Sequence, residues 1–169
     1  MLVKTFGAAV QGISATIVTI EVNVSQGLRF LIVGLPDNAV RESHERIASA
    51  LSFSGKRLPR MQVVINMAPA DIRKEGSAYD LPLAVGIMAA SNQIKTDLLE
   101  KFVLMGELSL DGGMKPIKGA LPIAVKAREA GYKGLLVPYQ NSKEAAVVTR
   151  LDVNGEKDIT EVIAFMNDD

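Results

Sequence analysis

Ser77 and the lysines that could serve it are the residues whose types and spacing suggest a reaction. A serine becomes a nucleophile when a neighbouring base takes its proton, and a desolvated lysine can be that base. Ser77 follows Lys74 in a polar loop, and Lys115 and Lys118 are candidate bases farther along the chain. One hypothesis is therefore a peptidase of the serine–lysine type, with Ser77 as nucleophile and Lys118 or Lys115 as base.

Most other catalytic or cofactor sites lack the residues that they need. The chain has no cysteine and a single histidine, His44, which excludes disulfides, thiolate zinc sites and iron–sulfur clusters and argues against a histidine-based metal site. The one Gly-Lys pair, Gly55-Lys56, lacks the flanking residues of a phosphate-binding P-loop. We therefore expect no cofactor and no metal within this chain.

A strand and a helix must position the loop that carries Ser77. Residues 61–67 are almost continuously apolar and predict a buried strand. A helix is predicted from about Asp80 to Ser91. Ser77 would then precede a helix N-terminus, where free backbone N–H groups can stabilise an oxyanion.

Three strands are predicted upstream of this unit, at residues 2–10, 13–24 and 28–33. The second has β-branched residues at period two, and the third is expected to return beside it as a hairpin. Residues 37–54 predict a helix that starts at an Asp37 or Asn38 cap.

His44 falls on the apolar stripe of this helix, with Val40, Ile47 and Leu51. We interpret it as a buried structural residue, because no second histidine or cysteine is available to work with it.

The second half of the chain alternates strands and helices. Strands are expected at 102–105, 134–138 and within 147–153, and helices near 120–130 and 159–166. The chain has 169 residues and no long linker, so we expect one domain, residues 1–169, of α/β (α+β) class with helices packed on a mixed β-sheet.

Lys56, Arg57 and Arg60 form a local basic group after the first long helix. They could contact phosphates of a nucleic acid. Alternatively, they could be solvent-exposed cations at a helix C-terminus, where positive charges complement the helix dipole. The solvated helix end is the simpler interpretation. The net charge of zero gives no long-range attraction for DNA or for an anionic membrane.

Three stretches resemble, in the same order, the proteolytic domain of Lon. They are GLPDNAVRESHERIASALSFSG, QVVINMAPADIRKEGSAYDLPLAVGIMAA and LMGELSLDGGMKPIKGALPIAVKAREAGYKGLLVPYQN. Aligned without gaps, the nucleophile of the Lon motif K-D-G-P-S-A-G falls on Ala78, and the Lon catalytic lysine falls on Leu121. The resemblance implies a Lon-like fold of the ribosomal protein S5 domain 2 type in which neither dyad member is present.

The opening MLVKTFGAAVQGISATIVTIEVNVSQGL, together with INMAPADIRKEGSAYDLPLA and GELSLDGGMKPIKGALP, is similar to the N-terminal domain of magnesium chelatase-related ATPases of the ComM or YifB type. That resemblance implies a downstream AAA+ module that binds ATP and Mg, a homo-oligomeric hexameric ring, and DNA as a partner. From the residues themselves, the N-terminus is not typical of a signal peptide and no apolar run is long enough for a membrane span, so we expect a cytoplasmic location and no membrane contact.

Three functions therefore stand before the structure is considered. The first is a non-catalytic domain for ring assembly and DNA engagement, with Lys56, Arg57 and Arg60 as candidate DNA contacts. The second is a divergent Lon-like peptidase that uses Ser77 and Lys118. The third is a standalone S5-like nucleic-acid-binding module.

Overall fold

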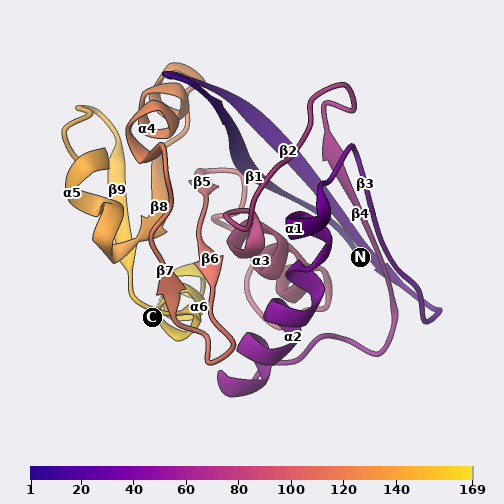
Figure 1. The fold of residues 1–169 in the computed structure, drawn as a ribbon. Helices are drawn as coiled ribbons and strands as arrows, with labels where there is room; N and C mark the ends of the chain where they lie inside the picture. Colours follow the sequence, from indigo (N-terminus) through magenta and orange to yellow (C-terminus); the bar gives the residue numbers. More distant parts are fainter. Residues whose placement is uncertain (169) are drawn as a thin grey trace.

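Two β-sheets and a short hairpin surround a buried helix in the computed structural model, which describes residues 1–168 (Figure 1). The first half contains β1 (Leu2–Gln11), β2 (Ser14–Ser25), β3 (Phe30–Val33), α1 (Asn38–Arg41), α2 (Ser43–Phe53), β4 (Gln62–Ala68) and α3 (Asp80–Ala90). The second half contains β5 (Phe102–Leu104), β6 (Glu107–Leu108), β7 (Met114–Lys115), α4 (Ala120–Glu129), β8 (Gly134–Pro138), the 3₁₀ turn η1 (Tyr139–Asn141), α5 (Ser142–Ala145), β9 (Asp152–Glu156) and α6 (Ile159–Met166). The predicted mixed α/β class is confirmed.

The larger sheet has the order β1-β2-β4-β3. β1 and β2 form an antiparallel hairpin, β4 runs antiparallel to β2, and β3 runs parallel to β4. The predicted hairpin between β2 and the strand at 28–33 is therefore wrong, because β4 lies between them. Alternate residues of β4 are fully buried whereas β3 is only partly buried, so β4 takes the central position and β3 the edge.

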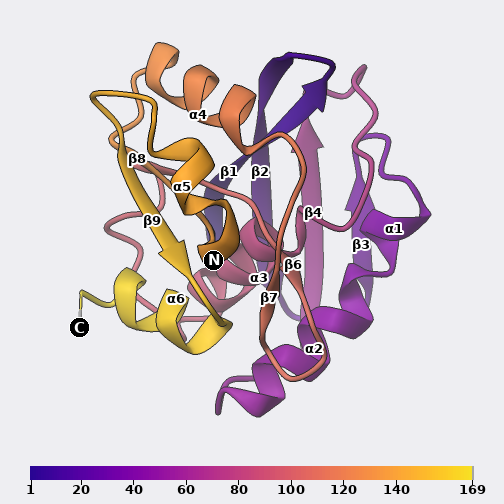
Figure 2. The same ribbon diagram turned by 60° about the vertical axis from the view of Figure 1, so that its left-hand side comes forward.

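The smaller sheet is parallel, with the order β5-β8-β9. β6 and β7 form a separate two-stranded hairpin around the turn at Asp111-Gly112. Figure 2 shows α4 and α5 beside β8 and β9, with α6 near the end of β9. The last strand lies at 152–156, a few residues after its predicted place within 147–153.

α3 is the centre of the core, since every one of its residues is buried. It packs against β1 and β2, and Gly86 permits this close approach because a Cβ there would lie 2.7 Å from Val22 Cγ2. The carbonyl of Pro82 accepts a hydrogen bond from the buried Thr5 hydroxyl at 2.9 Å. No helix in the described part of the chain is long and apolar enough to cross a lipid bilayer.

The helix predicted from Asp37 to Ser54 is two helices that meet at Glu42. Asp37 is the N-cap, as predicted, and its carboxylate accepts from the Val40 N–H at 2.8 Å.

The prediction that His44 is buried is wrong. Its side chain is 36% exposed, its ring packs in a T-shaped arrangement with that of Phe30, and its Nδ1 lies 3.0 Å from the Glu45 carboxylate. The buried residues of α2 are Ser43, Ile47, Ala50 and Leu51, and His44 lies beside this face and not within it.

Candidate functional site

A cavity of about 480 Å³ lies between β1, the loop that precedes α3, β6 and the segment that precedes α4. Its walls are mainly apolar, and its polar groups come from three of these segments. It is lined by Ala8, Val10, Glu75, Gly76, Ser77, Ala78, Tyr79, Met105, Glu107, Pro116, Ile117, Lys118 and Ile123. The fold therefore brings Ser77 and Lys118, the two predicted catalytic candidates, to one cavity.

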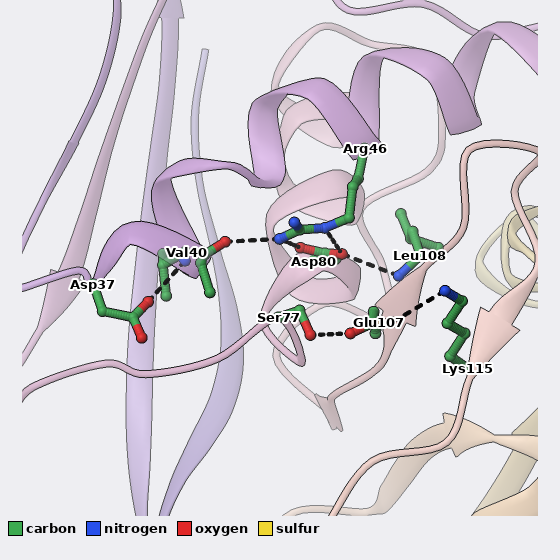
Figure 3. A network of polar contacts seen from close by, with 9 residues as sticks. Asp37, Val40, Arg46, Ser77, Asp80, Glu107, Leu108 and Lys115 are labelled. Carbon is green, nitrogen blue, oxygen red and sulfur yellow. Dashed lines mark hydrogen bonds and ion pairs between the residues drawn. The ribbon is translucent and has the colours of Figure 1, made fainter.

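The Ser77 hydroxyl donates to a carboxylate within this cavity. Its Oγ is bonded to Glu107 Oε1, and Glu107 Oε2 lies 3.7 Å from Lys115 Nζ (Figure 3). Lys118 is exposed and makes no hydrogen bond or ion pair with the residues that the structure describes. The polar partner of Ser77 is thus Glu107, which lies between the serine and Lys115.

The two positions that match the Lon dyad carry apolar side chains. Ala78 lines the cavity, and Leu121 is 39% exposed in the first turn of α4. The N–H of Leu121 lies 3.3 Å from the Glu144 carboxylate, which caps this helix end. Neither position can supply a hydroxyl or an amine to a reaction.

A buried ion pair holds the start of α3 against α2 and β6. Arg46 Nε donates to Asp80 Oδ2 at 2.7 Å and its Nη2 donates to Oδ1 at 2.9 Å (Figure 3). The same Nη2 donates to the carbonyl of Ala39, and the Leu108 N–H donates to Asp80 Oδ2 at 3.0 Å. One carboxylate therefore joins α2, the start of α3 and β6, and the last two of these adjoin the cavity.

The protonation of this ion pair follows from its burial and geometry. The hydrogen bond to Asp80 raises the pKa of Arg46. Burial raises the pKa of Asp80, and the bonds from Arg46 and the Leu108 N–H oppose that effect. Because the guanidinium keeps its proton at every pH at which proteins fold, it stabilises the ionised Asp80.

Lys74 anchors the loop that carries Ser77. Its side chain is fully buried, and its Nζ donates to the carbonyls of Gly34, at 2.7 Å, and Pro69. Burial lowers the pKa of Lys74, and the negative charge of Asp71 opposes the effect. Asp37 adds a second connection, because its Oδ2 accepts from the Gly76 N–H at 3.0 Å.

Tyr79 completes the floor of the cavity with a phenol that stays neutral. The residue is 3% exposed, and burial raises the pKa of Tyr79, with Asp37 and Glu75 acting in the same direction. No group of three or more histidine, aspartate or glutamate side chains among residues 1–168 is arranged to hold a metal ion.

The basic group lies outside the cavity, in the segment between α2 and β4. Arg57 and Arg60 are exposed and Lys56 is partly buried. The side chain of Gln93 fixes this segment, because it accepts from the Arg57 N–H and donates to its carbonyl. None of the three cations has an ion pair with a described residue, so their charges remain available to a partner.

Glu107, Lys74 and Asp80 are the site residues whose roles sequence reasoning missed. Glu107 lies in the stretch GELSLDGG, and no local pattern reports its contact with Ser77, which lies 30 residues earlier. A buried lysine bound by carbonyls leaves no sequence signal, because its partners are backbone atoms.

We predict that Ser77 does not react as a nucleophile with lysine assistance. A fluorophosphonate probe should leave Ser77 unlabelled, because its hydroxyl is held by a carboxylate and no lysine bonds to it. Intact-mass spectrometry measures the label, with an active serine hydrolase as the positive control. Labelling of Ser77 that disappears in Lys118→Ala would contradict the prediction and support the peptidase.

Comparison with known proteins places these features in a family. A family model described as subunit ChlI of Mg-chelatase matches residues 20–141. The chain is 36% identical to competence protein ComM of Haemophilus influenzae over 98% of its length, and 41% identical to YifB of Salmonella typhimurium over 84%. These matches cover 33% and 28% of the two relatives, so the chain spans about a third of their length.

Similarity also extends to Lon, in agreement with the Lon-like fold. Lon protease 2 of Bacillus subtilis is 30% identical over 65% of this chain, a match that covers 19% of the protease. The family match covers most of the chain, whereas the Lon dyad positions carry Ala78 and Leu121. The chain belongs to the family of magnesium chelatase-related proteins whose members include ComM and YifB.

Proposed function

We propose that the chain is a non-catalytic N-terminal domain of a magnesium chelatase-related ATPase, used for ring assembly and for engagement of DNA. The observation that carries the proposal is the cavity in which Ala78 occupies the nucleophile position and the neighbouring Ser77 donates to Glu107. A Lon-like fold that lacks the dyad residues is suited to a role in assembly and binding.

The Ser77–Glu107 pair is poorly suited to replace the missing dyad. A serine–lysine dyad needs a lysine amine within hydrogen-bond reach of the serine hydroxyl. No lysine among the described residues bonds to Ser77; its hydroxyl donates to Glu107, whose second oxygen lies 3.7 Å from Lys115 Nζ. The pair therefore holds the cavity in shape instead of activating the serine.

The whole protein would join this domain to an AAA+ module that binds ATP and Mg and forms a homo-hexameric ring in the cytoplasm. One relative carries the name competence protein, which agrees with a role in the processing of DNA during recombination, including branch migration. The ATPase activity, the ring and the DNA substrate belong to that proposal for the whole protein.

The DNA contacts would be made by Lys56, Arg57 and Arg60. Three phosphate contacts give a log–log salt slope of only about −2 to −3, so one domain binds weakly. A ring repeats the contacts, and multivalency can raise the overall affinity by about 10²–10⁴. We therefore expect weak DNA binding by the isolated chain and substantial binding by the assembled ATPase.

A salt series on the intact ATPase tests this prediction. The triple variant Lys56→Ala, Arg57→Ala, Arg60→Ala should bind DNA more weakly than wild type and with a shallower salt slope, measured by fluorescence anisotropy. A variant with the same charge change elsewhere, Arg128→Ala, Lys133→Ala, Lys143→Ala, should keep the wild-type slope, because these exposed cations lie on α4, the α4–β8 turn and α5. Equal losses in both variants would show that only net charge matters. Unchanged affinity in the first variant would leave the domain with assembly alone.

A further inference from the structure

The outer edge of the larger sheet is formed by β3, which has a neighbour on only one side among the described residues. The Val63 N–H donates to the Arg29 carbonyl at 2.8 Å, and this bond begins the parallel ladder between β3 and β4. Alternate residues of a parallel strand bond to the same neighbour, so Leu31 and Val33 continue the ladder. The backbone groups between them must point away from β4.

Phe30 and Ile32 therefore direct their N–H and C=O groups to the free side of β3. No backbone or side-chain group in residues 1–168 donates to or accepts from these four atoms. They form a short row of donors and acceptors at the spacing that an added strand requires.

The side chains along this edge carry none of the features that usually protect an exposed strand. Natural edge strands are protected by short length, lysines, prolines, bulges or inward-pointing charges. β3 is short, at four residues, and follows the exposed Arg29, but its own sequence is FLIV and it pairs with β4 without a bulge. Leu28, just before the strand, is 89% exposed, and Val33 at its end is 49% exposed. The edge is thus apolar, open and regular.

A groove of about 370 Å³ runs beside this edge, lined by Phe30, Leu31, Ile32 and Arg41. Arg41 is exposed at the end of α1, and it forms no ion pair with the described residues. The groove therefore combines apolar residues of β3 with one positive charge that an occupant could neutralise.

The positive charge of Arg41 distinguishes between two possible occupants of the edge, a second copy of β3 and an acidic peptide segment. Two copies of β3 could pair antiparallel about an axis through Leu31, with Phe30 opposite Ile32 of the other copy. That arrangement would bring the two Arg41 side chains to one junction, where like charges repel. An extended segment with a carboxylate beside Arg41 would form the same backbone bonds without this repulsion.

We propose that β3 binds an extended peptide segment of a partner protein as a fifth strand, with an acidic side chain of that segment beside Arg41. Alternate side chains of the segment face opposite sides of the sheet. Those on the side of α1 meet Arg41 with Phe30 and Ile32, and those on the other side meet Leu31 and Val33. The recognised segment is therefore acidic on the first side and apolar or β-branched on the second.

The test uses a defined probe, the acetylated and amidated pentapeptide Val-Thr-Glu-Thr-Val, with nuclear magnetic resonance of the 169-residue chain. The amide signals of Phe30 and Ile32 should shift and their hydrogen exchange should slow, while Leu31 and Val33, already bonded to β4, change little. A probe with lysine in place of glutamate should bind about 3- to 10-fold more weakly, because attraction to Arg41 becomes repulsion.

Two changes separate strand addition from non-specific contact. Ile32→Pro removes an N–H that faces the free side and leaves the ladder to β4 intact, so it should abolish binding with little change in circular dichroism. If that variant does not fold, a probe with an N-methyl group on its glutamate or on a neighbouring residue tests the same bonds, since methylation of the bonded amides should remove binding. Arg41→Gln should weaken binding about 2- to 5-fold, and the control Arg128→Gln should not.

Three outcomes would overturn the proposal. One is the absence of any shift at Phe30 and Ile32 at millimolar probe. Another is equal binding of the glutamate and lysine probes. The third is protection of Phe30 and Ile32 that grows with protein concentration in the absence of probe, which would assign the edge to a second copy of the chain. The cavity that contains Ser77 lies elsewhere, so these results are independent of the proposed assembly role.

Discussion

Replacement of Asp80 with alanine is expected to destabilise the fold by about 3–5 kcal/mol, because it leaves the Arg46 guanidinium partly buried without its partner. The Asp80 side chain is 1% exposed and that of Arg46 is 20% exposed, so water cannot fully replace the lost carboxylate. The Leu108 N–H would also lose its acceptor. Urea unfolding followed by circular dichroism measures the free energy of unfolding.

The double variant Arg46→Met, Asp80→Leu is the informative control. Removal of both charges avoids the unpaired ion, and an apolar replacement of a buried ion pair is often neutral or stabilising. The double variant should therefore be clearly more stable than Asp80→Ala alone. A double variant as unstable as the single one would show that the carboxylate acts through its bond to Leu108 and not through Arg46.

Gly34→Ala is expected to lower the stability by more than about 3 kcal/mol or to prevent folding. Gly34 has φ of +106°, a conformation that L-residues rarely adopt, and a Cβ there would overlap the carbonyl oxygen of Met67 in β4. Since the obstacle is backbone, no side-chain rotation can relieve it. The carbonyl of Gly34 also accepts from Lys74, so movement of this residue would disturb the loop that carries Ser77.

Gly12→Ala is the matched control for this prediction. Gly12 also has positive φ, +61°, but a Cβ there would meet no atom within 4 Å. Gly12→Ala should lower the free energy of unfolding by about 1–2 kcal/mol, which is the conformational cost of an L-residue at positive φ alone. Thermal or urea unfolding of both variants compares the two positions. Similar losses would mean that conformation, and not the contact with Met67, makes Gly34 necessary.

Periodicity predicted the element types well and their pairing less well. β2 was recognised from its β-branched alternation, and β8 from its apolar run between glycine and proline. The error at β3 arose because neighbouring strands were assumed to pair. On the side away from β1, β2 pairs with β4, where Thr19 lies opposite Ala68, and no local pattern reports a pairing across that distance.

His44 illustrates a second limit of periodicity. It shares helical spacing with Val40 and Ile47, but the buried face of α2 runs through Ser43, Ile47 and Ala50, and His44 lies at the margin of that face. Ser43 takes the buried position, and its hydroxyl has no partner among the described residues. Helical spacing with core residues therefore does not decide whether a side chain lies within the buried face or at its margin.

The sequence predicted where the candidate site lies, but it did not predict the hydrogen bonds between the residues of the site. The loop with Ser77 and the segment with Lys118 do line one cavity. The bond from Ser77 to Glu107 and the carbonyl partners of Lys74 depend on tertiary approach, since their members lie far apart in sequence or are backbone atoms. Residue types suggested chemistry, whereas only the geometry showed which groups meet.

The strand order of the larger sheet also determines when each strand can pair during translation. β1 and β2 can close their hairpin as soon as both have left the ribosome, but β3 has no partner until β4 follows it. At translation rates of about 5–20 residues per second, the nascent chain carries the apolar FLIV segment unpaired for roughly two to seven seconds before Ala68 is added. During that interval the segment is open to chaperones and to other nascent chains.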